Sequence, residues 1–291
     1  MTTCAAEPVT QPSAPSAPPA GALPEAIRSE LRDRLRSGIA PVVERLPEGD
    51  QVVVTLPLLR RARIDPEGAA VEEPFSWKPA FVRRSLGLAV VDACASGRFN
   101  SPAEAVGPIA AAALLDWERT GWRTFHWEPW LAGLAPGARA AVLAGGLGWA
   151  TSVWCALDWS RYEPRPEIGG CDDQWICPAS RTVRLKGRSE LRVSARPEGR
   201  TDGPRGPETL VSVASGCPGP EWEVELGFLA LVAAVRSRSR PVPAHVTGLW
   251  PDAGLSLTAK IDAGVLTAAA DLVSTTVASV VAARIAIDQR P

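Results

Sequence analysis

The amino-acid sequence predicts an α/β fold in which a helical region precedes a mixed sheet flanked by helices. From about residue 75 to 158 the apolar residues follow helical spacing, whereas strand and helix patterns alternate after Thr182. An order of strand, strand, buried helix, strand, hairpin partner and helix is typical of layered α/β domains. With 291 residues, 46% hydrophobic and 22% charged, the chain can bury one large core or two modest ones.

The N-terminal part of the chain predicts a tail, one helix and one short strand. Residues 1–22 are rich in Pro, Ala, Ser and Thr and too poor in apolar surface to offset the entropy of ordering, so we expect a disordered tail. Residues 24–38 (PEAIRSELRDRLRSG) have one apolar stripe, which predicts an exposed amphipathic helix that stops at Gly38. A strand is expected over residues 51–56, followed by a loop up to Glu73.

Three helices are predicted in the next region. Ser76 is placed to cap a helix from about Lys78 to Ala95. Ser101, followed by a proline and then by Glu104, forms a capping box for a second helix that reaches about residue 118. The third helix covers about residues 137–158, and its glycines predict either close packing against a neighbour or a kink.

Residues 122–130 (WRTFHWEPW) concentrate tryptophans with Phe125 and His126. Aromatic rings at this density can stack on nucleobases. Irregular spacing is more typical of a junction between packed elements, and we favour that interpretation. Because His126 and His245 are the only histidines, a histidine-rich metal site is excluded.

The stretch from Thr182 to Val193 (TVRLKGRSELRV) alternates charged residues with apolar or small ones, after a polar connection that contains Asp172 and Asp173. A period of two predicts one strand with a core face and a polar face. On the polar face Glu190 projects from a row of four cations: Arg184, Lys186, Arg188 and Arg192. This pattern is typical of a half-solvated sheet strand, and it is also what a site for a phosphodiester and a metal ion requires.

The C-terminal part predicts further strands and two apolar helices. The helix at residues 221–236 is apolar nearly all round between Leu226 and Val235, as expected for a crossover helix buried against a sheet. The other expected elements are strands at 208–214 and 244–250, a hairpin partner at 255–261 and a final helix at 263–287. Residues 264–283 contain Asp271 and several Ser and Thr, so a packed helix is favoured over a membrane span.

Charge and cysteine usage limit the function classes. A net charge of -1 gives no global attraction to nucleic acid or to a membrane, so any such attraction must be local. Residues 181–205 supply one local patch, with eight cations against three anions. The six cysteines form no CxxC pair, which predicts free thiols in a reducing, cytoplasmic compartment. We expect no membrane partner.

Two short motifs and the helix after them resemble the RecB-like branch of the PD-(D/E)XK nuclease superfamily. GRSELRV at 187–193 is similar to a Gly-Arg-x-Asp strand motif, and LVSVASG at 210–216 aligns with Asp/Glu-x-Lys-x-Gly. The helix pattern VELGFLALVAAVR places Val224 and Phe228 at the glutamine and tyrosine of the family's third motif. The resemblance covers about residues 75–287 and implies a restriction-endonuclease-like core.

The resemblance also assigns the catalytic positions. Glu190 stands at the first acid, Ser212 at the second acid and Ala214 at the lysine. In such nucleases two carboxylates hold a divalent cation that activates water, and the lysine assists. Losing two catalytic groups at roughly 3 kcal/mol each lowers the rate by several decades. Glu190 is therefore expected to be the remnant of a catalytic pair.

Three functions follow from these observations. The first is a catalytically inactive nuclease-like protein, without a cofactor, that binds DNA, RNA or a protein partner, with Arg184, Lys186, Arg188 and Arg192 as the nucleic-acid contacts. The second is an active nuclease using Mg²⁺ or Mn²⁺ at Glu190, with Glu225 as a migrated ligand. The third is a scaffolding protein that uses the tryptophan-rich segment or the first helix.

We expect three segments in the chain. A tail at 1–22 and a segment at 23–74 precede a nuclease-like domain at 75–291, which comprises a helical part at 75–160 and an α/β core at 175–291.

Overall fold

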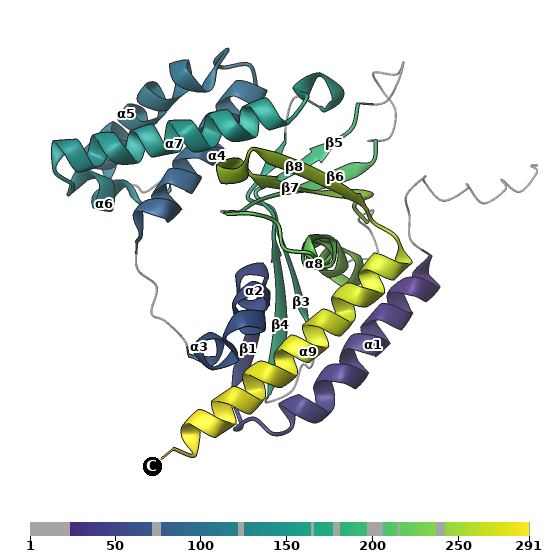
Figure 1. Ribbon diagram of the computed structural model, residues 1–291. Helices are drawn as coiled ribbons and strands as arrows, with labels where there is room; N and C mark the ends of the chain where they lie inside the picture. Colours follow the sequence, from purple (N-terminus) through teal and green to yellow (C-terminus); the bar gives the residue numbers. More distant parts are fainter. Residues whose placement is uncertain are drawn as a thin grey trace, which may run out of the picture.

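The computed structural model has two sheets and layers of helices around them (Figure 1). It describes residues 24–71, 77–121, 125–163, 166–176, 181–196, 206–214, 216–236 and 242–290. The predicted α/β class with mixed sheets and flanking helices is confirmed. The expected tail at 1–22 lies outside the described residues.

The small sheet has the strand order β1-β4-β3 and the large sheet the order β2-β5-β6-β7-β8. β1 is parallel to β4 and β6 is parallel to β7, while the other pairs are antiparallel. The strands are β1 (Gln51–Thr55), β2 (Glu167–Ile168), β3 (Cys171–Trp175), β4 (Thr182–Arg188), β5 (Leu191–Ser194), β6 (Glu208–Val213), β7 (His245–Trp250) and β8 (Leu255–Lys260).

Helices cover both faces of the large sheet. α4 to α7 pack on one face, and α8, α9, α1 and α2 form the second core with the small sheet (Figure 1). The helices are α1 (Glu25–Val43), α2 (Leu56–Ile64), α3 (Pro66–Ala70), α4 (Pro79–Ala95), α5 (Pro102–Thr120), α6 (Glu128–Ala132), α7 (Pro136–Ala156), α8 (Trp222–Arg236) and α9 (Ala263–Asp288). Two short 3₁₀ turns lie at Trp159–Arg161 and Pro251–Ala253.

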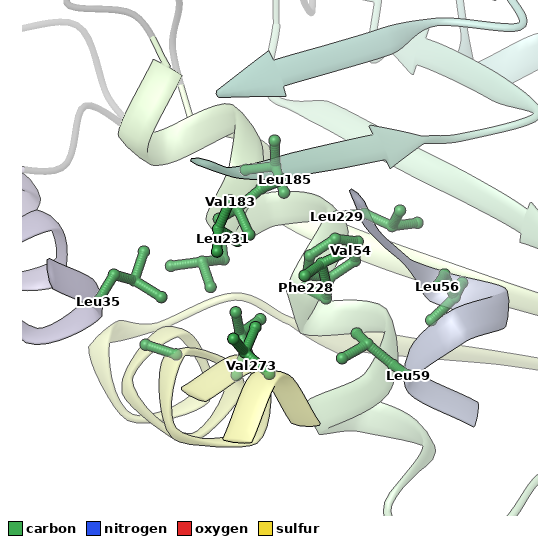
Figure 2. Packing of buried hydrophobic residues seen from close by; sticks show 14 of the residues in the cluster. Leu35, Val54, Leu56, Leu59, Val183, Leu185, Phe228, Leu229, Leu231 and Val273 are labelled. Carbon is green, nitrogen blue, oxygen red and sulfur yellow. The ribbon is translucent and has the colours of Figure 1, made fainter. Parts of the chain in front are cut away.

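α8 is the central helix, as its all-round apolar sequence predicts. Every residue from Glu225 to Val235 is buried, and α8 contacts α1, α2, α9 and strands of both sheets. Figure 2 shows Phe228, Leu229 and Leu231 of α8 among side chains of β1, β4, α2 and α9. The helix joins the parallel strands β6 and β7, so it is the crossover that a parallel pair needs.

The first helix differs from its prediction in length and in exposure. α1 continues through Gly38 to Val43, and its apolar stripe is buried against α9 and α8. A Cβ atom at Gly38 would lie 2.6 Å from Oγ of Ser274 on α9. Gly38 therefore permits a close helix crossing, and the expectation that it ends an exposed helix was wrong.

The loop expected before Glu73 is also corrected, because its described part up to Val71 forms two helices. The hydroxyl of Thr55 accepts a hydrogen bond from the backbone N–H of Leu58 at 3.2 Å, which caps α2. Asp65 caps α3 in the same way at Gly68. β1, just before them, joins the small sheet beside β4, so residues 24–71 belong to the second core.

The predicted helical region is confirmed as α4, α5 and α7. The hydroxyl of Ser101 caps α5 by accepting from the backbone N–H of Glu104, as expected, whereas the Glu104 carboxylate accepts from the backbone N–H of Asn100 instead of Ser101. Ser76 lies outside the described residues. Glycines on facing helices allow α4 and α7 to approach, since a Cβ atom at Gly87 would lie 2.4 Å from the ring of Trp149. In the described part of the tryptophan-rich segment, Trp127 is fully buried and its indole N–H donates to Ser85, which supports a junction.

The strand predicted from Thr182 to Val193 is divided, and this is the main correction to the fold. β4 ends at Arg188 in the small sheet, and β5 begins at Leu191 in the large sheet. Val183 and Leu185 of β4 face the core that contains α8, whereas Leu191 and Val193 of β5 face the core made by α4 to α7. The apolar residues keep their odd positions throughout, but the core that they face changes at residues 189–190, which lie outside both strands.

α9 is the one described helix that is long and apolar enough to cross a membrane. Its buried residues, including Leu266, Val273 and Val280, pack in the core with α8 and α1. This packing agrees with the predicted core helix and is compatible with a soluble protein.

Removing a core side chain from α8 tests its central position. Leu231→Ala should lower the free energy of unfolding by about 2–5 kcal/mol, because Leu231 is fully buried and its cavity is closed by packed helices. Leu115→Ala on α5 is the matched control, because Leu115 is 67% exposed and its change should stay within about 0.5 kcal/mol. Urea unfolding followed by circular dichroism measures both, and equal effects would contradict this role of α8.

Candidate functional site

The break between β4 and β5 places Glu190 inside the protein. Its carboxylate is 3% exposed and forms an ion pair with Arg84 of α4, whose own side chain is 34% exposed. Oε1 contacts Arg84, while Oε2 is buried and has no hydrogen-bond partner among the described residues. Glu190 therefore does not project from the cationic row of β4, and that part of the prediction was wrong.

The surroundings of Glu190 act on its charge in opposite directions. Burial raises the pKa of the carboxyl group above its ordinary value, because the charged form loses its hydration. The positive charge of Arg84, backbone N–H groups and the hydroxyl of Ser212 all lower that pKa, and burial outweighs them. Arg84 is thus the described cation that compensates a deeply buried acid.

Ser212 lies near Glu190, because β6 pairs with β5 directly after Glu190. The backbone N–H of Glu190 donates to the carbonyl of Val211 at 3.0 Å, next to the antiparallel pairing of β5 with β6. Ser212 is buried on β6, on the side where its hydroxyl lowers the pKa of Glu190. Ala214 follows at the end of β6, where its backbone N–H donates to Leu249 of β7. Phe228, which the resemblance aligned with a tyrosine, is buried in the core.

Two pockets meet at Ala214. The first has a volume of about 340 Å³ and lies between α2 and the start of α8, where Arg60 and Arg63 line it; we name it the α2–α8 pocket. The second has a volume of about 460 Å³ and lies between α4, α7 and the end of β6, where Arg83 and Arg84 line it; we name it the α4–α7 pocket. Four arginines therefore stand on the two sides of Ala214.

Glu225 lies in the α2–α8 pocket, and its arginine partners differ from the arginine that pairs with Glu190. Arg60 donates to it at 3.0 Å and Arg63 at 2.6 Å. Arg63 also pairs with Glu221 one helical turn earlier. No group of three or more His, Cys, Asp and Glu side chains able to hold a metal ion occurs within the described ranges.

Arg192, which was expected to contact nucleic acid, does not lie on the surface. Its side chain is 5% exposed and forms ion pairs with Asp172 of β3 and Glu208 of β6. Arg236 at the end of α8 donates to Asp172 at 2.7 Å. A nucleic acid cannot reach a side chain that is buried and paired in this way, so the prediction for Arg192 was wrong.

The other three predicted cations remain on one face of the small sheet. Arg184 is bound by Asp173 and lies 5.1 Å from the ring centre of Trp175, which is 44% exposed. Lys186 is partly buried and Arg188 is exposed, and both belong to the face opposite α8. These three stay candidates, although Asp173 offsets part of their charge.

The sequence interpretation missed Arg84, Arg60 and Arg63. The two arginines on α2 lie in a stretch that was expected to be a loop, and the cap at Thr55 with Pro57 was the signal for a helix there. Arg84 comes from a helix about one hundred residues before Glu190, so no local pattern connects them. Asp172 was assigned to a connection, although it lies on β3.

Comparisons with known proteins give no relative for this chain. No family model, no curated protein and no solved structure matches it.

The buried acid predicts a pH dependence of stability. Because the folded-state pKa of Glu190 is raised, the carboxyl group favours folding below its ordinary pKa, and this contribution is lost as the pH rises through the folded-state value. The free energy of unfolding of the wild type, minus that of Glu190→Gln, should therefore decrease from pH 4 to pH 8. Urea unfolding at each pH measures the difference.

Glu118→Gln on α5 controls for the loss of one carboxylate at an exposed position. A wild-type curve that gains stability over Glu190→Gln as the pH rises would contradict the raised pKa.

Proposed function

We propose that this chain is a catalytically inactive protein of the PD-(D/E)XK nuclease type that binds nucleic acid without a metal ion. The observation that carries the proposal is the ion pair of Arg84 with Glu190, beside Ser212 and Ala214. The guanidinium group of Arg84 contacts Oε1 of Glu190, so a cation already compensates the charge of this carboxylate. It supplies a fixed positive charge and hydrogen-bond donors suited to phosphate.

The arginines around Ala214 support the choice of nucleic acid as partner. Arg60 and Arg63 face Ala214 from α2, and Arg83 and Arg84 face it from α4. Electrostatic contact with phosphates supplies most of the affinity of sequence-independent binding. A single strand of nucleic acid that crosses the end of β6 would pass between these two pairs of arginines.

An active nuclease is supported less well. Glu225, its candidate second ligand, is neutralised by Arg60 and Arg63, and Glu190 is neutralised by Arg84. Ser212 offers one neutral hydroxyl, and Ala214 offers no proton donor, so the chemistry that the family performs lacks its groups.

A scaffold that uses α1 is also supported less well, because the apolar stripe of α1 is already buried. The free thiols at the described cysteines agree with a cytoplasmic location, which is part of the proposal.

Oligonucleotide binding tests the proposal directly. The protein should bind single-stranded DNA or RNA with an affinity that falls as salt rises, and it should not cleave either in Mg²⁺ or Mn²⁺. Arg63→Ala with Arg83→Ala should lower the slope of log K against log salt by roughly 1.4, at about 0.7 per lost single-strand contact. Fluorescence anisotropy measures the slope, and absence of binding at low salt would overturn the proposal.

Two double variants locate the contact. Arg36→Ala with Arg119→Ala removes two exposed, aspartate-paired arginines on α1 and α5, and the slope should not change. Lys186→Ala with Arg188→Ala tests the open face of the small sheet. If oligonucleotide affinity falls in this variant but not in Arg63→Ala with Arg83→Ala, the binding surface is the face of the small sheet and not the surroundings of Ala214.

A designed metal site tests whether the positions correspond to the nuclease motifs. Arg84→Ala, Ser212→Asp and Ala214→Lys together remove the guanidinium and supply the missing carboxylate and lysine, so this variant should bind Mn²⁺ where the wild type does not. Adding Glu190→Gln to the same variant should abolish that binding. Calorimetry measures both, after circular dichroism has established folding; Mn²⁺ binding that persists without Glu190 would contradict the assignment.

A further inference from the structure

The α4–α7 pocket has the size and lining of a small-molecule site. Its volume of about 460 Å³ lies within the range of about 300–1,000 Å³ that is usual for ligand pockets. Arg83, Arg84, Trp149 and Ser152 supply the charged, aromatic and hydroxyl groups. Gly148 and other small residues leave the space open.

The charge of this pocket favours an anionic ligand. No carboxylate occurs among its described lining residues, whereas Arg83 and Arg84 both reach it from consecutive positions on α4. The stem of Arg83 lies over Gly145, where a Cβ atom would be 2.1 Å from its Cδ, and its Nε donates to the carbonyl of Pro79 at 3.3 Å. Arg84 is held by Glu190. Two oriented guanidinium groups fit a phosphate.

The aromatic wall favours a planar group next to that phosphate. The indole of Trp149 packs against Gly87 on α4, which fixes its orientation, and it is partly exposed at the pocket. A fixed aromatic face stacks on a nucleobase at little entropic cost. The hydroxyl of Ser152 donates to the carbonyl of Gly148 at 2.9 Å, so its oxygen is available to accept a hydrogen bond.

We propose that the α4–α7 pocket binds one phosphorylated nucleoside, with the phosphate on Arg83 and Arg84 and the base on Trp149. The inference rests on the proposed function in taking nucleic acid as the partner, and it adds the subsite and the unit recognised. Two sources share this chemistry: a free mononucleotide, or the phosphorylated terminal nucleotide of a single strand. Recognition of a terminal nucleotide would distinguish the ends of a strand from its interior.

Filling the pocket gives the sharpest test. A Cβ atom at Gly148 meets nothing within 4 Å, so Gly148→Leu should fold normally and project into the pocket. Gly137→Leu is the matched control, because it makes the same change on the same helix, also with open space around it and away from the pocket. Melting temperatures of both variants establish folding before ligands are added.

The ligands are 5′-AMP, adenosine and inorganic phosphate, measured by isothermal titration calorimetry on the full chain. We expect 5′-AMP to bind at least tenfold more tightly than adenosine or phosphate, and Gly148→Leu to abolish this binding while Gly137→Leu retains it. Arg83→Ala should reduce the preference for 5′-AMP over adenosine. No binding of 5′-AMP, or binding that survives Gly148→Leu, would overturn the proposal.

Oligonucleotides separate the two sources and separate this proposal from the proposed function. A 5′-phosphorylated single strand that displaces 5′-AMP, when the same strand with a 5′-hydroxyl does not, identifies a terminal nucleotide as ligand. Displacement by neither strand, with tight 5′-AMP binding, identifies a free nucleotide. If the oligonucleotides bind Gly148→Leu and the wild type equally, while 5′-AMP binds neither protein, the proposal of a nucleotide site in the α4–α7 pocket is overturned. The proposed function would still stand.

Discussion

The need to cover α8 on every side determines much of the architecture. Its residues from Leu226 to Val235 are apolar around the whole circumference, and each large side chain that leaves water contributes about 1.5–3 kcal/mol. One neighbour cannot bury such a helix. The chain therefore brings α9 and α1 to one side, the small sheet to another and the large sheet to a third (Figures 1 and 2). The segment before residue 71, which carries β1 and α2, supplies part of this cover.

In this arrangement the segment from Thr182 to Val193 contributes one strand to each sheet. β4 presents its apolar residues to α8, and the strand is then interrupted at Ser189 and Glu190, so that the apolar residues of β5 face α4 to α7. Glu190 lies at this interruption and is buried. A buried acid needs a compensating cation, and Arg84 provides it from the helical side. The candidate site is thus a consequence of how the two cores are joined.

A second group of buried charges fastens the two sheets together. Asp172 on β3 belongs to the small sheet, and Arg192 and Glu208 belong to the large sheet. Arg236 joins them from the last turn of α8. Breaking such a group by removing one partner leaves an uncompensated buried charge, so the pairing fixes the position where the sheets meet. The same pairing withdraws Arg192 from solvent, whereas the paired arginines around Ala214 stay about one third exposed and are therefore the better partners for a phosphate.

The sequence by itself determined the elements whose signals are local. Capping at Ser101, the all-round apolar α8, the hairpin of β7 and β8 and the apolar α9 all follow from residues within one element. It also placed Glu190 and Ser212 on successive strand segments, and Glu190 lies directly before β5, which pairs with β6. Tertiary structure alone decided that Gly38 lies at a helix crossing, that Thr182 to Val193 divides between two sheets, and that Arg84 reaches Glu190. Each of these depends on contacts between residues far apart in the chain, and a periodic pattern contains no information about which distant side chain will lie against it.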